Sequence, residues 1–329
     1  MADLNWMQRY AATEFVELSD SGIMDRREAL GWLAKVFGST AAAATFLGAC
    51  SNSSDSRSST SPSLRTKPTS TSGAPASSST PSGLVPPTGG GAGHVLAVAP
   101  DDPAVRERTV EFAGPASQIT GSLAEPTSPT AGALAGVIVI HEIFGLNDHI
   151  RDVARRLAKV GYLALAPDLA SRAGGTDHTS NVIGALTGGP IEDRVADLRA
   201  AAHFVEGLDG FSGKLGVVGF CFGGGMTLSY AAADPKVAAA VSYYGPTPEP
   251  ASMMRGTKAA VLAHYGADDA RVNAGIAALE SAMAGKTVRQ HVWPGAAHQF
   301  NNDTSPAYRE QVAVEAWTET LGWFDRYLR

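Results

Sequence analysis

The sequence predicts an α/β fold in residues 105–329, with a mostly parallel central sheet and helices on both faces. Short, continuous apolar runs rich in β-branched residues alternate there with longer amphipathic patterns. Such runs are typical of strands buried on both faces, and their alternation with helices is typical of parallel sheets. The length of this region suits one domain.

The elements follow in a regular order. Strands are expected at residues 108–114, 116–126, 135–142, 163–169, 214–220, 237–245, 259–266 and 287–295, and helices at 149–162, 191–208, 226–234, 272–285 and 307–328. In open sheets of this class, ligands bind outside the carboxyl ends of the strands. The residues that directly follow each strand are therefore the candidates for a functional site.

Composition excludes several classes of function. The formal net charge is -6, and no block of lysines or arginines is long enough to follow a phosphate backbone, so we expect no nucleic-acid partner. The two cysteines, Cys50 and Cys221, cannot form a disulfide scaffold. A single bridge between them is the alternative, disfavoured because it would join a flexible segment to a turn. No ligand spacing indicates a metal, and we expect no cofactor.

The N-terminal 50 residues resemble an export signal. Paired arginines, Arg26 and Arg27, precede a moderately apolar run that ends in LGAC, as in a twin-arginine signal with a lipobox. Cys50 would then carry a lipid and attach the protein to the outer face of a bacterial membrane. An amphipathic helix with a buried cysteine, in a cytoplasmic protein, is the alternative. Met1 and Met24 are both candidate starts, with Met24 giving the more usual signal.

A linker is expected between this segment and the sheet. Residues 51–104 are mostly Ser, Thr, Pro and Gly, a composition that cannot bury a core. The predicted organisation is therefore a signal over residues 1–50, a linker over 51–104 and a catalytic domain over 105–329.

Cys221 is the candidate nucleophile. It stands in the pattern Gly219-Phe-Cys221-Phe-Gly223 directly after an expected strand. A tight turn from strand to helix needs small residues on both sides of an exposed nucleophile, and the start of the helix favours a thiolate. A buried cysteine at a strand end is the alternative.

Two later strand ends carry candidate partners for this cysteine. Asp269 follows one strand and would orient a histidine, with its neighbour Asp268 as the rival. His298 follows the last expected strand. The chain order nucleophile, acid, histidine is that of α/β-hydrolases.

A third strand end carries Glu142, a carboxylate among apolar residues that needs a partner. The loop that contains it normally supplies one oxyanion-hole N–H, here that of Ile143. The residue after the nucleophile, Phe222, would supply the other.

Together, HEIFGLNDHIRDVARRLAKVGYLALAPDL, GFCFGGG, GADDARVN and PGAAHQF resemble the dienelactone hydrolase family of α/β-hydrolases, from about residue 107 to the C-terminus. The resemblance implies hydrolysis of an ester or lactone through a thioester on Cys221, with His298 as base and Asp269 as orienting acid. It also implies that Glu142 assists ionisation of the thiol.

The resemblance weakens at the substrate. The family uses arginines to hold a substrate carboxylate, but Asn302 stands at one of these positions and Arg172 is the only candidate we assign for the other. We therefore expect a small ester or lactone substrate and do not assign its charge, the natural ester or the oligomeric state. A non-catalytic surface lipoprotein that retains the fold is the alternative function, and thiol redox sensing is a weaker one.

Overall fold

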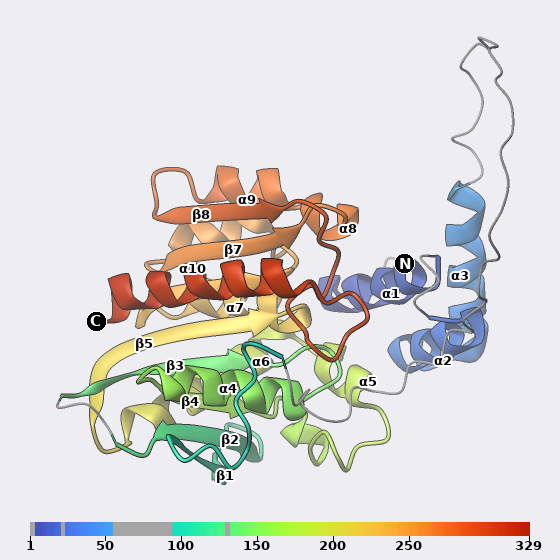
Figure 1. Ribbon diagram of the computed structural model, residues 1–329. Helices are drawn as coiled ribbons and strands as arrows, with labels where there is room; N and C mark the ends of the chain where they lie inside the picture. Colours follow the sequence, from blue (N-terminus) through green and yellow to red (C-terminus); the bar gives the residue numbers. More distant parts are fainter. Residues whose placement is uncertain (1–3, 21–23, 55–93, 129–131) are drawn as a thin grey trace, which may run out of the picture. The chain divides into compact units, whose positions relative to one another are not determined.

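The computed structural model describes residues 4–20, 24–54, 94–128 and 132–329 (Figure 1). The chain divides into two compact units. Residues 1–11 and 86–329 form the first, here called the sheet unit, and residues 12–85 form the second, here called the helical unit.

The sheet unit contains an eight-stranded sheet in the order β1-β2-β4-β3-β5-β6-β7-β8. Its strands are β1 (Val105–Ala113), β2 (Gln118–Pro126), β3 (Leu134–Ile140), β4 (Leu163–Pro167), β5 (Phe211–Phe220), β6 (Val237–Tyr243), β7 (Ala260–Gly266) and β8 (Val288–Trp293). Every pair from β4 to β8 is parallel, whereas β1 and β2 form an antiparallel hairpin that continues antiparallel onto β4. The expected mostly parallel sheet is therefore confirmed.

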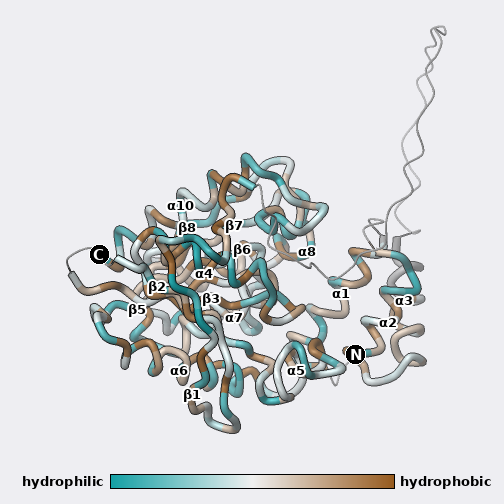
Figure 2. The backbone as a smooth tube through the Cα atoms, turned by 60° about the horizontal axis from the view of Figure 1, so that its bottom comes forward, coloured by the Kyte–Doolittle hydropathy of each residue, from teal (hydrophilic) through white to brown (hydrophobic). Residues whose placement is uncertain are grey.

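Helices cover both faces of this sheet (Figure 1). On one face lie α4 (Asp148–Lys159) and α10 (Glu310–Leu328), and on the other lie α6 (Ile191–Glu206) and α7 (Phe222–Ala233). The alternation of apolar and polar stretches that produces these layers can be followed along the chain in Figure 2. Helix α4 begins where the side chain of Asn147 accepts a hydrogen bond from the Ile150 amide, an N-cap of the usual kind.

Some elements differ from the prediction. The helix expected over residues 272–285 is two short helices, α8 (Ala270–Asn273) and α9 (Ile276–Ala282). Asp269 caps the first by accepting from the Val272 amide, and Gly275 separates the two. Helix α10 begins at Glu310 rather than 307, since the preceding residues form hydrogen-bonded turns. The sequence patterns did not predict α5 (Val182–Thr187) or the 3-10 helices η2 (Ser171–Ala173) and η3 (Ala251–Gly256).

Strand order places a topological switch point at the middle of the sheet. After β3 the chain adds β4 on one side, and then β5 on the other side of β3. At such a switch point the connections leave in opposite directions, so the carboxyl ends of β3 and β5 border an open site. Ile140 and Gly219 are paired in the register of these strands, so the loops that follow them begin at the same level.

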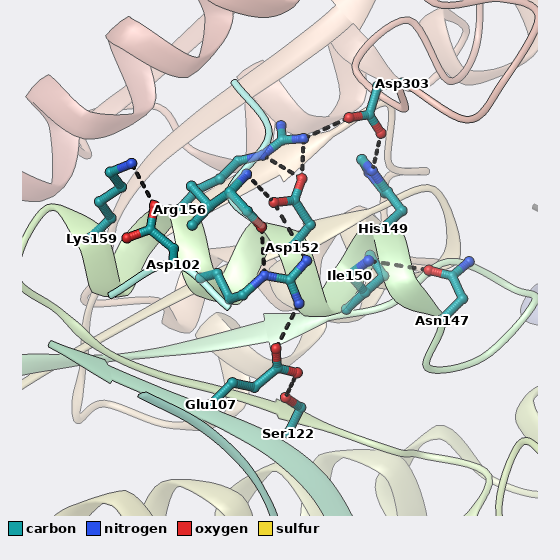
Figure 3. A network of polar contacts seen from close by, with 12 residues as sticks. Asp102, Glu107, Ser122, Asn147, His149, Ile150, Asp152, Arg156, Lys159 and Asp303 are labelled. Carbon is teal, nitrogen blue, oxygen red and sulfur yellow. Dashed lines mark hydrogen bonds and ion pairs between the residues drawn. The ribbon is translucent and has the colours of Figure 1, made fainter. Parts of the chain in front are cut away.

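A buried charge network fixes α4 to the loop that precedes α10 (Figure 3). Arg156 contacts both Asp152 and Asp303, and the distance from its Nη2 to the Asp303 Oδ2 is 2.8 Å. The ring nitrogen Nδ1 of His149 lies 2.8 Å from the other Asp303 oxygen. Because these side chains are buried, each charge depends on its partners for stabilisation.

The helical unit contains α2 (Arg26–Phe37) and α3 (Thr40–Ser54), while α1 (Trp6–Asp20) crosses the division between the units. Asp25 caps α2 by accepting from the Glu28 amide, and Gly38 ends it in a left-handed conformation. Within the described ranges, no single helix is long and apolar enough to cross a bilayer. Residues 26–37 and 40–48 reach the required length and apolarity only as a pair bent by 120°.

Much of the predicted N-terminal organisation falls outside the described residues. The backbone at Cys50 belongs to α3, but its side chain lies outside them, as do residues 55–93 of the expected linker. The lipidation of Cys50, the linker and the three-part division remain predictions.

Candidate active site

Cys221 lies on a strained turn between β5 and α7. Its φ of 56° and ψ of -119° are unusual for a residue with a side chain, and it occupies the N-cap of α7. Such strain persists only where the surrounding structure imposes it, and it is common at functional sites. The amide of Cys221 donates to the carbonyl of Tyr243 at 3.0 Å, which fixes the turn to the neighbouring strand.

The glycines on either side of the turn permit close contact between the backbones. A Cβ at Gly219 would lie 2.1 Å from the carbonyl oxygen of Gly223, and one at Gly223 would lie 2.3 Å from that of Ile140. Real side chains do not approach backbone atoms so closely. The small residues of the motif are therefore required by the turn itself.

Two glycine substitutions should have opposite effects on stability. Gly223→Ala should lower the free energy of unfolding by about 2 kcal/mol or more, because backbone atoms must move to accept the methyl group. Gly322→Ala in α10, where nothing lies within 4 Å of the new Cβ, should raise it by about 0.5 kcal/mol. Urea unfolding of both variants measures the difference, and equal effects would contradict the packing argument.

His298 and Asp269 come together from the loops after β8 and β7. The Nδ1 atom of His298 lies 2.5 Å from the Oδ2 atom of Asp269, and both side chains are buried. Asp268, the rival in sequence, is exposed. Burial alone would raise the pKa of Asp269, but the charge of His298 and its hydrogen bond lower that pKa below its ordinary value. A carboxylate so held fixes the orientation of the imidazole.

The thiol lies beside this pair. The sulfur of Cys221 and a ring nitrogen of His298 are within 4.8 Å of each other. Contacts between a nucleophile and its base often shorten further when a substrate binds. The structure thus brings Cys221, His298 and Asp269 into the order that nucleophilic catalysis requires.

Glu142 is buried and held by two hydrogen bonds. The side-chain amide of Asn302 donates to its Oε2 at 2.8 Å, and the hydroxyl of Tyr244 donates to its Oε1 at 3.3 Å. Burial, followed by the charges of Glu142 and Cys221, raises the pKa of Tyr244 well above its ordinary value, so this phenol stays protonated and donates. Asn302, the other candidate for contact with a substrate, therefore has Glu142 as a partner in this structure.

Tyr244 is a site residue that the sequence analysis missed. It follows β6 directly, has a φ of 39°, and its ring packs edge-on against that of His298 with 4.9 Å between centroids. The expected strand over residues 237–245 included Tyr244, whereas β6 ends at Tyr243, so inspection of the residues after each strand did not reach it. A tyrosine in an apolar run is also more often a core residue than a hydrogen-bond donor to a carboxylate.

His141 fixes the loop that carries Glu142. The amide of Leu169 donates to its Nε2 at 3.1 Å, so its Nδ1 carries the proton and donates to the carbonyl of Glu142 at 2.7 Å. Burial lowers the pKa of His141, in keeping with this neutral form. The ends of β3 and β4 are thereby joined beneath the site.

The expected oxyanion donors lie in suitable local structure. Phe222 is the first residue of α7. The backbone N–H groups in the first turn of a helix have no hydrogen-bond acceptor within that helix. Ile143 lies in a turn in which the amide of Gly145 donates to the carbonyl of Glu142 at 3.1 Å. Both residues are buried next to the two strand ends.

Arg172, the candidate for holding a substrate carboxylate, is paired with an aspartate in this structure. Its guanidinium donates to both carboxylate oxygens of Asp197, at 2.7 and 3.0 Å, and to the carbonyl of Asp193. This paired geometry joins η2 to α6. The structure does not bring Arg172 into contact with Glu142, Cys221, Asp269 or His298 in any of the interactions described above.

The sequence model of the dienelactone hydrolase family matches residues 119–328. The chain belongs to the dienelactone hydrolase family. The match includes every candidate catalytic residue of the sheet unit and leaves out the N-terminal segment.

Relatives and solved structures agree with this assignment. The chain is 37% identical over 213 residues to the "Putative carboxymethylenebutenolidase" of Methylorubrum extorquens, covering 60% of this chain and 73% of that protein. A crystal structure titled "Putative Dienelactone Hydrolase" from Klebsiella pneumoniae superposes with a TM-score of 0.63 at 32% identity, covering 68% of this chain and 100% of that one. The dienelactone hydrolase of Anabaena variabilis gives a TM-score of 0.55 at 25% identity, covering 69% and 100%. The predicted α/β-hydrolase fold is confirmed.

Proposed function

We propose that this dienelactone hydrolase family protein cleaves a carboxylic ester or lactone through an acyl-thioester on Cys221. The observation that carries the proposal is the position of the Cys221 sulfur on a strained turn, within 4.8 Å of a His298 ring nitrogen whose partner is Asp269. A nucleophile, a base and a group that orients the base are the parts that acyl transfer needs.

The reaction proceeds in two halves. His298 takes the thiol proton, Cys221 sulfur bonds to the carbonyl carbon, and the amides of Ile143 and Phe222 stabilise the oxyanion. The bond to the leaving oxygen breaks, and His298 returns the proton to that oxygen. Water then gives a proton to His298 and attacks the thioester, and the carbon–sulfur bond breaks to release the acid and restore the thiol.

Glu142 assists this cycle from a fixed position. Its carboxylate, held by Tyr244 and Asn302, lies in the same buried centre as the thiol, and the charges of Glu142 and Cys221 both act on the phenol of Tyr244. A carboxylate near a thiol can assist its ionisation when a substrate binds, while His298 takes the proton. This role accords with the function that the family resemblance implies.

The two positions assigned to binding of a substrate carboxylate favour an uncharged group there. Asn302 contributes a neutral amide that is already bonded to Glu142, and Arg172 is paired with Asp197. Neither residue offers a cation to a substrate carboxylate. We therefore propose a neutral ester or lactone in place of the carboxymethylenebutenolide for which the relatives are named.

Covalent trapping tests the thioester. Brief incubation of the full chain with 4-nitrophenyl acetate, followed by acid quenching, should add one acetyl group, located on Cys221 by peptide mass spectrometry. The His298→Gln variant should accumulate less of this species, because the thiol loses its base. Acetylation only at lysines, with turnover retained, would overturn the mechanism.

Alkylation separates this proposal from a non-catalytic surface protein. An activated Cys221 should react with iodoacetamide well below the pH at which ordinary thiols react, whereas an inert buried thiol should not. The Asp269→Asn variant provides a matched control, since it keeps the shape of the site and removes the charge that orients His298.

We also propose, from the sequence, that the N-terminal segment directs export and that Cys50 is lipidated. The paired arginines, the apolar run and LGAC support this proposal. Mass spectrometry of the membrane fraction should recover a diacylglyceryl-modified Cys50 at a new N-terminus. Recovery of intact residues 1–50 from the soluble fraction alone would overturn it.

A further inference from the structure

The first helical turns of the sheet unit bring a tyrosine to the catalytic thiol. Tyr10 belongs to α1 and to the residues 1–11 that form one compact unit with the sheet. Its hydroxyl oxygen lies 3.4 Å from the sulfur of Cys221. The guanidinium carbon of Arg271 lies over its ring, 4.5 Å from the ring centre.

The side chain of Tyr10 lies where part of a substrate would lie. In a reactive complex the attacked carbonyl carbon lies about 3–3.5 Å from the nucleophile, and the ester oxygen is bonded to that carbon. A phenolic oxygen 3.4 Å from the sulfur therefore lies where the oxygen of an aryl ester would be. The ring of Tyr10 then extends where the aryl leaving group would extend.

We propose that Arg271 forms an aryl subsite of the active site, that the substrates are esters of phenols, and that in the uncleaved chain, which still carries residues 1–49, Tyr10 occupies this subsite when no substrate is bound. The proposal rests on the proposed hydrolase function and deepens it by naming the leaving group. An arginine over an aromatic face attracts the ring quadrupole. It also stabilises the negative charge that spreads into the ring as a phenolate leaves.

The position of Arg271 is fixed by the catalytic acid. Asp269 caps α8, and Arg271 is the second residue of that helix. The backbone of Arg271 thus has a defined location relative to His298, which Asp269 holds, and the charge of Arg271 helps to lower the pKa of Asp269. Any ring that Arg271 holds is placed next to the base that protonates the leaving oxygen.

Met7, Tyr10 and Ala11 are buried, but the polar contacts of the N-terminal residues are ones that a substrate can displace. The side-chain amide of Asn5 donates to the carbonyls of Thr187 and Gly189, and Arg9 forms an ion pair with Glu249 in which both side chains are largely exposed. Exposed pairs of this kind contribute little to stability. A cavity of about 300 Å³ remains beside this segment, and its lining includes Met7, Leu186, Met226 and Met253. Incomplete packing means fewer contacts to lose when Tyr10 leaves.

The first experiment tests whether Tyr10 competes with the substrate for the aryl subsite. In the full chain, Tyr10→Ala should raise kcat/KM for phenyl acetate about tenfold, because the substrate no longer has to displace a bound ring. Tyr10→Phe should remain within about twofold of the wild type, since it keeps the ring that Arg271 contacts. An unchanged value in Tyr10→Ala would overturn the occupancy of the subsite by Tyr10.

The second arm measures the role of Arg271. Phenyl acetate and 2,2,2-trifluoroethyl acetate are both activated esters, but only the first has a ring. In the Tyr10→Ala background, Arg271→Met should lower the ratio of their kcat/KM values about fivefold, and Arg271→Lys should restore part of it. Arg326→Met is the matched control, because Arg326 lies over the ring of Tyr327 on α10, and it should leave the ratio unchanged.

Direct binding separates failure of this proposal from failure of the hydrolase function. Calorimetry of the Tyr10→Ala chain should give a dissociation constant for 4-methylphenol, the side chain of tyrosine, about fivefold lower than for 4-methylcyclohexanol. Equal affinities, with an ester ratio insensitive to Arg271, would overturn the aryl subsite while leaving hydrolysis intact. Selective binding of 4-methylphenol without turnover of either ester would instead overturn the hydrolase.

Discussion

Replacing Cys221 with alanine is expected to lower kcat/KM for 4-nitrophenyl acetate by at least about 10⁴-fold, because the substitution removes the sulfur on which the proposed acyl-enzyme forms. The turn should remain intact, since its geometry is imposed by the close contacts of Gly219 and Gly223 with neighbouring backbone. Initial rates over a range of substrate concentrations, together with the far-ultraviolet circular dichroism of both proteins, measure the two effects separately.

Two further variants serve as controls for Cys221→Ala. Cys50→Ala removes the second cysteine of the chain and should retain the wild-type rate. Cys221→Ser keeps a shorter, harder nucleophile beside His298 and should retain at most a small fraction of the activity. Turnover by Cys221→Ala at the wild-type rate would show that another residue carries the reaction, or that it proceeds by direct attack of water.

Replacing Asp303 with asparagine should lower the free energy of unfolding by about 3–4 kcal/mol at pH 7, as expected when one member of a buried ion cluster is removed. Asp303 contacts His149 and Arg156, and the side chains of all three are nearly inaccessible (Figure 3). Asn302, the residue before Asp303, donates to Glu142, so loss of the Asp303 contacts should also reduce activity. Urea unfolding at pH 7 and ester hydrolysis measure the two consequences.

We also expect the effect of Asp303→Asn on the free energy of unfolding to depend on pH. Burial alone would raise the pKa of Asp303, but its hydrogen bond to His149 and the charges of His149 and Arg156 lower it below the ordinary value. This stabilisation is present above the unfolded pKa and is lost as the pH falls through the folded one. The difference in stability between wild type and Asp303→Asn should therefore shrink on acidification from pH 5 towards pH 3. Glu206→Gln, which breaks the exposed pair with Lys236, is the control and should cost less than about 1 kcal/mol.

The sheet was predictable because its signal is local. The run of β3 is apolar throughout, the last six residues of β5 are apolar and buried, and β6 is apolar except for one serine. The pairing of β1 with β2, and the break between α8 and α9, were not predictable in the same way. The β1–β2 pairing depends on which strand packs at the edge of the sheet. The break between α8 and α9 depends on the cap at Asp269, a residue that also belongs to the candidate site.

The candidate site was partly predictable for a related reason. Residues after strands share one edge of the sheet, so chain order alone brought Cys221, Asp269 and His298 together as candidates. Side-chain partnerships do not follow from chain order. Asn302 bonds to Glu142 across 160 positions, and Arg172 pairs with Asp197, because the loops between strands fold against one another in ways that local patterns do not encode.

The residues of the candidate site follow separate strands, and this distribution determines how activity is lost when the protein begins to unfold. Glu142, Cys221, Tyr244, Asp269 and His298 follow β3, β5, β6, β7 and β8 in turn. The last of these strands lies at the sheet edge, with five of its six residues at least partly exposed. Edge elements of this kind open locally at a lower free energy than the core. A transient opening of β8 would carry His298 away while the rest of the sheet stayed folded, so catalytic competence is expected to be the first property lost under mild denaturing conditions.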